Sequence, residues 1–183
     1  METTANNKGI VPLYGLFAGL AMVLIMLFLY LGGVSAFMGF LGWIKYPIII
    51  FIAVLAAQKV KKQNGGYLQF SEAVKIVFGV FALGFLLETI FSYILLNFID
   101  PGFRDALAQA TMEKMGEMMK RFGATEEQIE KAITDGMNKN NYTLGKVFVG
   151  YGVVCIVSFI FALIVAAIVK KNKPVFDDNA FNQ

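Results

Sequence analysis

Two ionisable residues, Lys45 and Glu88, interrupt long apolar runs in this 183-residue chain. A charged side chain at the centre of a membrane helix costs about 2.5–3.5 kcal/mol even on translocon-based scales. Lys45 lies 14 residues before Lys59, and Glu88 lies 13 residues after Lys75. Helical rise then puts the two at about 21 and 20 Å from the same membrane boundary. Equal depth on antiparallel helices predicts an intramembrane ion pair between Lys45 and Glu88.

A second interpretation assigns Lys45 to a membrane-interface cluster with Trp43 and Tyr46, from which its ammonium group reaches the lipid headgroups. The helix would then begin at Pro47. Only about 12 residues would remain before Gln58, or about 18 Å, which is too short for a hydrocarbon core of about 30 Å. We therefore expect the helix to begin before Pro47, and we favour an ion pair that locks the helices together over a proton relay.

The chemistry available to the chain is narrow. It contains no histidine, and Cys155 is its single cysteine. Ser-His-Asp catalysis, haem ligation, zinc sites and intrachain disulfides are therefore all excluded. No spacing of carboxylates, lysines or tyrosines indicates general acid–base catalysis. We expect no enzyme activity, no metal, no cofactor and no nucleic-acid partner.

Apolar composition predicts the fold class. Hydrophobic residues make up 57% of the chain and charged residues 16%. The apolar runs predict membrane spans at about 10–31, 36–58, 73–98 and 147–169, each long enough to cross a bilayer. The sequence therefore predicts an all-α integral membrane protein, with four transmembrane helices in a single membrane domain over residues 1–183.

Lysines abut the helix ends on one side of the membrane. With four spans, the N-terminus, the loop near residue 65 and the C-terminal tail share that side, and the lysines there are Lys8, Lys59, Lys61, Lys62, Lys75, Lys170, Lys171 and Lys173. The positive-inside rule then predicts that both termini are cytoplasmic.

The segment between the third and fourth spans predicts a two-helix amphipathic extracytoplasmic insertion at about 101–138. Asp100 followed by Pro101 is typical of a helix start, and Gly123 of a helix end. Thr125 and Gln128 fit a capping box that opens the second helix. The insertion is therefore expected to be a helical hairpin.

The first helix of this hairpin carries an apolar stripe at helical spacing. The stripe can pack on the second helix and on the outer membrane surface, or it can serve as an adaptable contact surface for a lipid chain or a partner helix. Copper binding by methionine sulfur is the least favoured use, because histidine is absent. The candidate contact residues are Phe103, Leu107, Met115, Met119 and Phe122, and Met118 is an alternative to Met119 in the stripe.

Two functions fit these features. The first is a non-enzymatic accessory or scaffold subunit of a membrane process, which needs lipids and a protein partner but no catalytic group. The alternative is a small lipid or solute carrier that uses a polar path near Lys45 and Glu88. Such a path requires the deep polar residues to converge on one cavity, and the candidates are Lys45, Glu88, Tyr151, Cys155 and Ser158.

Four motifs in order carry a family resemblance: NGGYLQFSEAVKI at 64–76, NFIDPGF at 97–103, TEEQIEKA at 125–132 and VKKNKP at 169–174. With them the chain resembles the bacterial four-span membrane proteins catalogued as domain of unknown function 4199. The resemblance implies four transmembrane helices, a bacterial inner-membrane location and no established activity or catalytic residue. It also hints at a membrane glycosyltransferase as a partner. It implies no role for Lys45 or Glu88.

Overall fold

The structure, a computed structural model, describes residues 9–137 and 142–173. Lys8, the tail beyond residue 173 and Asn138, the last residue of the predicted hairpin, lie outside these residues. The described chain is a multi-pass, all-α membrane protein with four helices long and apolar enough to cross a bilayer. These are α1 (Ile10–Leu31), α3 (Lys45–Gln63) with the preceding 3-10 helix η2 (Phe40–Ile44), α4 (Phe70–Ile94) with its π-helical extension η3 (Leu95–Ile99), and α7 (Leu144–Val169).

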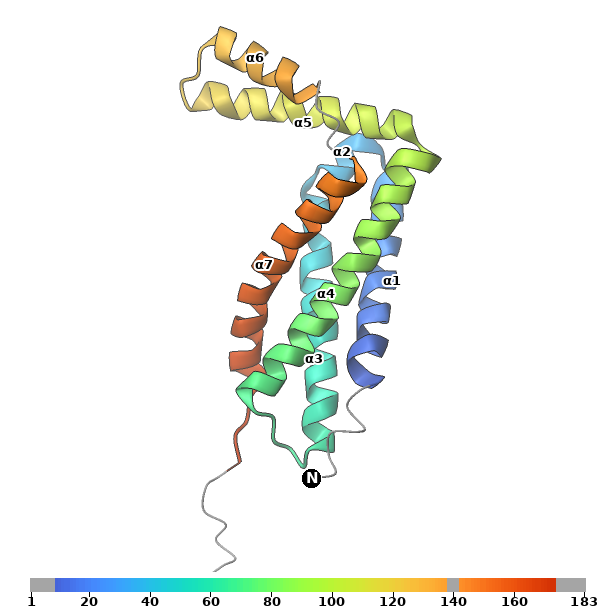
Figure 1. The fold of residues 1–183 in the computed structure, drawn as a ribbon, viewed down its shortest axis with the longest axis vertical. Coiled ribbons are helices and arrows are strands. Elements are labelled where there is room, and N and C mark those ends of the chain that lie inside the picture. The colour runs from blue at the N-terminus through green and yellow to red at the C-terminus, as the bar shows by residue number, and fades with distance from the viewer. Residues whose placement is uncertain (1–8, 138–141, 174–183) are drawn as a thin grey trace, which may run out of the picture.

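Helix α4 is the centre of the bundle, because it packs against α1, α3 and α7 (Figure 1). Gly15 and Gly19 of α1 lie against Leu83 and Leu87 of α4. A Cβ added at Gly15 would lie 2.7 Å from Leu83 Cβ, so the two helices approach closely only because glycine is present. The GxxxG pattern in the first span thus serves packing within the bundle.

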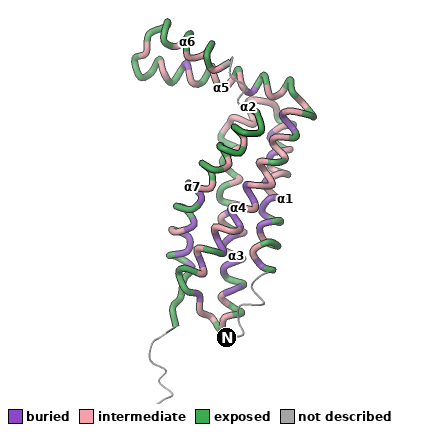
Figure 2. The backbone as a smooth tube through the Cα atoms, in the orientation of Figure 1, coloured by how far each residue is buried: buried purple, intermediate pink, exposed green. Residues whose placement is uncertain are grey.

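The two ends of the bundle differ. At one end, here called the loop end, the α3–α4 loop meets the segment after α7: Leu68 and Lys171 exchange two backbone hydrogen bonds of 2.8 Å, and Lys61 Nζ donates to the carbonyl oxygen of Val169. The buried residues of α7 all lie between Ser158 and Val169, nearest this end. The other half of α7 is largely exposed (Figure 2).

The second span begins differently from the predicted single helix over 36–58. A short helix, α2 (Gly33–Phe37), is followed by a break at Met38 and Gly39 and then by η2. Gly39 explains the interruption, because its backbone is extended, with φ −81° and ψ −178°, and glycine weakens a continuous helix. The α-helix does begin before Pro47, which occupies its first turn, where a missing N–H costs no helical hydrogen bond.

The insertion forms a helical hairpin of α5 (Pro101–Arg121) and α6 (Glu126–Met137). It crosses the other end of the bundle, here called the hairpin end, and projects beyond it (Figure 1). The predicted helix boundaries are confirmed: the backbone N–H of Phe103 donates to Asp100 Oδ1 at 2.8 Å, and Gly123 has a φ of +84°. Thr125 and Gln128 form the predicted capping box.

Candidate functional site

The structure brings Lys45 and Glu88 together. The Lys45 Nζ to Glu88 Oε1 distance is 2.7 Å, and the bond joins α3 to α4. Lys45 begins the 19-residue α3, and Glu88 is the nineteenth residue of α4, so each lies about 27 Å along its helix from the loop end. Matching helical position therefore produces the contact that the sequence predicts.

Lys45 also belongs to the aromatic cluster of the second interpretation. Its Nζ lies 5.5 Å from the ring centroid of Tyr46, and the rings of Trp43 and Tyr46 are 5.6 Å apart. The ion pair and the aromatic contact therefore coexist, although the helix does not begin at Pro47 as the second interpretation required. The side chains of Lys45 and Glu88 keep exposed fractions of 26% and 14%, so the ion pair is partly accessible.

A cavity of about 270 Å³ adjoins this pair. Residues from α1, α2, η2, α3 and α4 line it, including Phe37, Trp43 and Tyr46 beside the two charged groups. An ammonium group can donate three hydrogen bonds and a carboxylate has two accepting oxygens. The described residues supply one hydrogen bond between them, so each group has capacity for a ligand. We call this space the ion-pair cavity.

A cluster of Tyr30, Asp100 and Phe103 anchors the hairpin to the bundle. The Tyr30 hydroxyl donates to Asp100 Oδ2 at 2.9 Å, and the Phe103 ring packs edge-on against Tyr30 and against Phe37. The backbone N–H of Phe103 and the Tyr30 hydroxyl donate to the carboxylate, and both lower the pKa of Asp100 below its ordinary value. Sequence reasoning identified Asp100 as a helix cap but missed Tyr30, because no local pattern links residues 70 positions apart.

Two further contacts hold this end in place. Lys114 Nζ of α5 donates to the carbonyl oxygen of Met38 at 3.2 Å, across the break after α2. Asn97 Nδ2 of η3 donates to the carbonyl oxygen of Tyr142 at 3.2 Å. The first contact attaches α5 to the α2 region, and the second attaches the end of the third span to the segment before α7.

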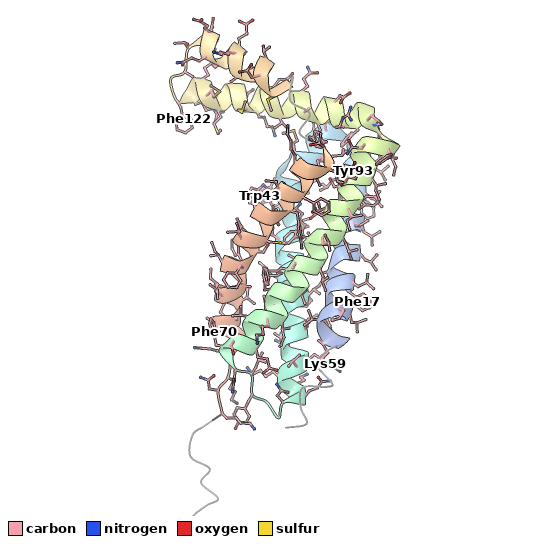
Figure 3. The ribbon with its side chains drawn as sticks, in the orientation of Figure 1. Phe17, Trp43, Lys59, Phe70, Tyr93 and Phe122 are labelled. Carbon is pink, nitrogen blue, oxygen red and sulfur yellow. The ribbon has the colours of Figure 1, made fainter. Side chains whose placement is uncertain are left out.

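The candidate contact residues have different surroundings. Leu107 is buried and Phe103 is half-buried, so both serve the protein's own packing. Met115 and Met119 are half-buried, whereas Phe122 is 85% exposed at the far end of α5 (Figure 3). Met118, the alternative to Met119 in the predicted stripe, is 55% exposed. Exposed apolar surface on the hairpin is therefore concentrated at Met118 and Phe122, here called the hairpin tip.

The second hairpin helix covers part of α5. Gly116 of α5 packs against Ile129 and Ile133 of α6, where a Cβ at Gly116 would come within 3.2 Å of either side chain. Two of the apolar residues of α6, Ile129 and Ile133, therefore pack within the hairpin itself. The hairpin tip lies beyond it.

Three of the five deep polar residues line cavities. Lys45 and Glu88 line the ion-pair cavity, and Ser158 lines a largely apolar groove among α3, α4 and α7. Tyr151 and Cys155 line neither of these spaces, and the Tyr151 hydroxyl donates to the carbonyl oxygen of Ala82. The convergence required for a polar carrier path is not observed among these residues. Within residues 9–137 and 142–173, no group of three potential metal ligands comes together.

The chain matches a known protein family. A family described as "Protein of unknown function (DUF4199)" matches residues 13–171. No curated protein and no solved structure matches the chain.

Proposed function

The chain belongs to the DUF4199 family of proteins of unknown function, and we propose that it is a non-enzymatic accessory subunit of a membrane process. Its four helices would hold the α5–α6 hairpin at the membrane surface as a contact platform. The absence of histidine from the whole chain supports a role without catalysis.

One observation carries the proposal: the hairpin is anchored at its base and apolar at its tip. Tyr30, Asp100 and Lys114 make hydrogen bonds that attach the base to the bundle. Met118 and Phe122 are exposed at the projecting end. Large apolar side chains held away from a protein's own core are typical of a contact site. A membrane protein is the expected partner, and a glycosyltransferase is the first candidate to test.

We also propose that the protein resides in a bacterial inner membrane with both termini cytoplasmic and the hairpin outside. The lysines of the loop end support this orientation under the positive-inside rule. Lys170 and Lys171 there lie over the rings of Phe70 and Tyr67, as expected for residues at a membrane interface. The carrier alternative has less support, because Tyr151 and Cys155 lie apart from the ion-pair cavity.

The test replaces the hairpin tip. Met118→Ser with Phe122→Ser should abolish recovery of the partner from cross-linked membranes and reproduce the phenotype of a full deletion. The matched control is Glu113→Ser with Glu117→Ser, two exposed residues of the same helix. It should retain partner and function. A tip variant that inserts normally and keeps every partner and activity would refute the accessory proposal.

A further inference from the structure

A groove lies among α3, α4 and α7 in the part of the bundle where α7 is largely exposed. Its volume is about 410 Å³, within the range of about 300–1,000 Å³ typical of ligand sites. Its walls include Ile49 and Ile50 of α3, Phe81 and Phe85 of α4, and Val154 of α7. A groove with such walls accommodates hydrocarbon. We call it the α3–α7 groove.

The α3–α7 groove meets the ion-pair cavity. Trp43 and Tyr46 line both spaces, so these two rings form a shared boundary between an apolar groove and a charged cavity. Both rings are exposed. The α3–α7 groove is apolar and ends beside charged groups. It therefore suits an amphiphile whose hydrocarbon chain lies in the groove and whose polar headgroup lies beside the charges.

The charges of the cavity specify the headgroup. Lys45 attracts a phosphate, but Glu88 lies 2.7 Å from Lys45 and repels a headgroup that carries only negative charge. A headgroup with both a phosphate and a primary ammonium group satisfies both partners. The phosphate accepts from the free donors of Lys45, and the ammonium donates to the second oxygen of Glu88. A quaternary ammonium group has no N–H to donate.

We propose that this protein binds one phospholipid with an ethanolamine-type headgroup, whose phosphate and ammonium groups contact Lys45 and Glu88 and whose acyl chain occupies the α3–α7 groove. The site is independent of the hairpin tip and goes beyond the accessory function proposed above. A phospholipid held here fills the space beside the uncovered half of α7 and stabilises the contact of α7 with α3 and α4.

The position of the site suits entry from the bilayer. Val153 and Val157 of α7 line the groove and are exposed on a membrane-spanning helix. Lateral entry therefore needs no opening of the helix bundle. Lys45 and Glu88 lie nearer the hairpin end than the loop end, so the headgroup belongs to the leaflet on the hairpin side.

The experiment uses the full chain, reconstituted into vesicles that contain equal parts of phosphatidylethanolamine, phosphatidylcholine and phosphatidylglycerol. The protein is extracted in mild detergent, and the retained lipid is identified by native mass spectrometry. We expect about one phosphatidylethanolamine per chain, enriched about tenfold over either other lipid, which is equivalent to about 1.4 kcal/mol. Val154→Trp, which fills the groove and leaves the ion pair in place, should abolish this retention.

Two further variants separate the parts of the site. Val149→Trp places the same bulky ring on an exposed position of α7 outside the groove, and it should retain the lipid as the wild type does. Lys45→Met with Glu88→Leu should remove the tenfold preference among headgroups. Equal retention of the three lipids by the wild type, a preference for phosphatidylglycerol, or unchanged retention in Val154→Trp would overturn the proposal.

Discussion

At the scale of single residues, the bond between Lys45 and Glu88 determines whether two charges are tolerable in a membrane helix. Each charge alone would be costly in hydrocarbon, and the 2.7 Å contact offsets that cost. The residual exposure of both side chains means that the protein does not fully enclose either charge. The pair therefore acts first as a lock between α3 and α4.

The lock predicts an asymmetry between single and double substitutions. Lys45→Met should reduce the free energy of unfolding by roughly 2 kcal/mol, less than the about 3–5 kcal/mol for a fully buried pair, because both groups retain some exposure. Lys45→Met with Glu88→Leu should cost less, because no unpaired charge remains. Unfolding in mixed micelles measures both values. A double variant that is less stable than the single variant would contradict the lock.

Sequence reasoning could predict this pair because depth along a helix follows from residue counting. Lys45 and Glu88 lie at nearly equal numbers of residues from lysines at the same boundary. Because the helical rise per residue is constant, equal counts mean equal depth. The α3–α7 groove could not be predicted in the same way. Its walls depend on which helices are neighbours and on where α7 loses contact with the bundle, and the apolar residues of a membrane span look alike in sequence whether they face lipid or protein.

At the scale of elements, the hairpin depends on one carboxylate at its base. Asp100 caps α5 by accepting a hydrogen bond from the backbone N–H of Phe103, and it accepts a second hydrogen bond from the hydroxyl of Tyr30. The helix start was predictable, because Asp followed by Pro has a local physical meaning. The direction in which the hairpin projects was not, because it depends on Tyr30, Phe37 and Met38 in a distant part of the chain.

A pH dependence follows from the lowered pKa of Asp100. The ordinary value is 3.8 and the folded value is lower, so ionised Asp100 contributes its full stabilisation above about pH 4. The contribution is lost as the pH falls through the folded pKa. Asp100→Asn should therefore lower the melting temperature at pH 7, and this deficit should shrink progressively as the pH falls below about 4, as measured by thermal unfolding of both proteins.

The control for this experiment is Asp105→Asn, which changes an exposed carboxylate on the same helix. It should leave the melting temperature nearly unchanged at pH 7. A deficit of Asp100→Asn that stays constant across the whole pH range would show that the charge of Asp100 is not what stabilises the hairpin base.

At the scale of the whole molecule, the bundle depends on the close approach of α1 and α4. Gly19→Ile should destabilise the protein by about 1–3 kcal/mol, because the new side chain would meet Leu87. Leu20→Ile, on the exposed face of α1, should change stability by less than about 0.5 kcal/mol. Unfolding in detergent compares the two. Equal stability of both variants would mean that α1 and α4 can separate without cost.

The loop end and the hairpin end are expected to face opposite sides of the membrane. Lysines surround the loop end, where Lys61 and Lys171 bond to the backbone of neighbouring segments. Moving these cations across the bilayer during insertion is unfavourable, so the loop end should remain cytoplasmic. The hairpin has helix caps and exposed charged residues of its own, which suit it to water at the opposite surface.

Cysteine labelling tests this orientation in a Cys155→Ala background, which removes the native thiol. Gln109→Cys on α5 and Asn172→Cys after α7 both alter exposed residues. A membrane-impermeant maleimide should label Gln109→Cys in intact cells and label Asn172→Cys only after the membrane is permeabilised. The reverse pattern would invert the topology, and it would show that the lysines at the loop end do not set the orientation of the bundle.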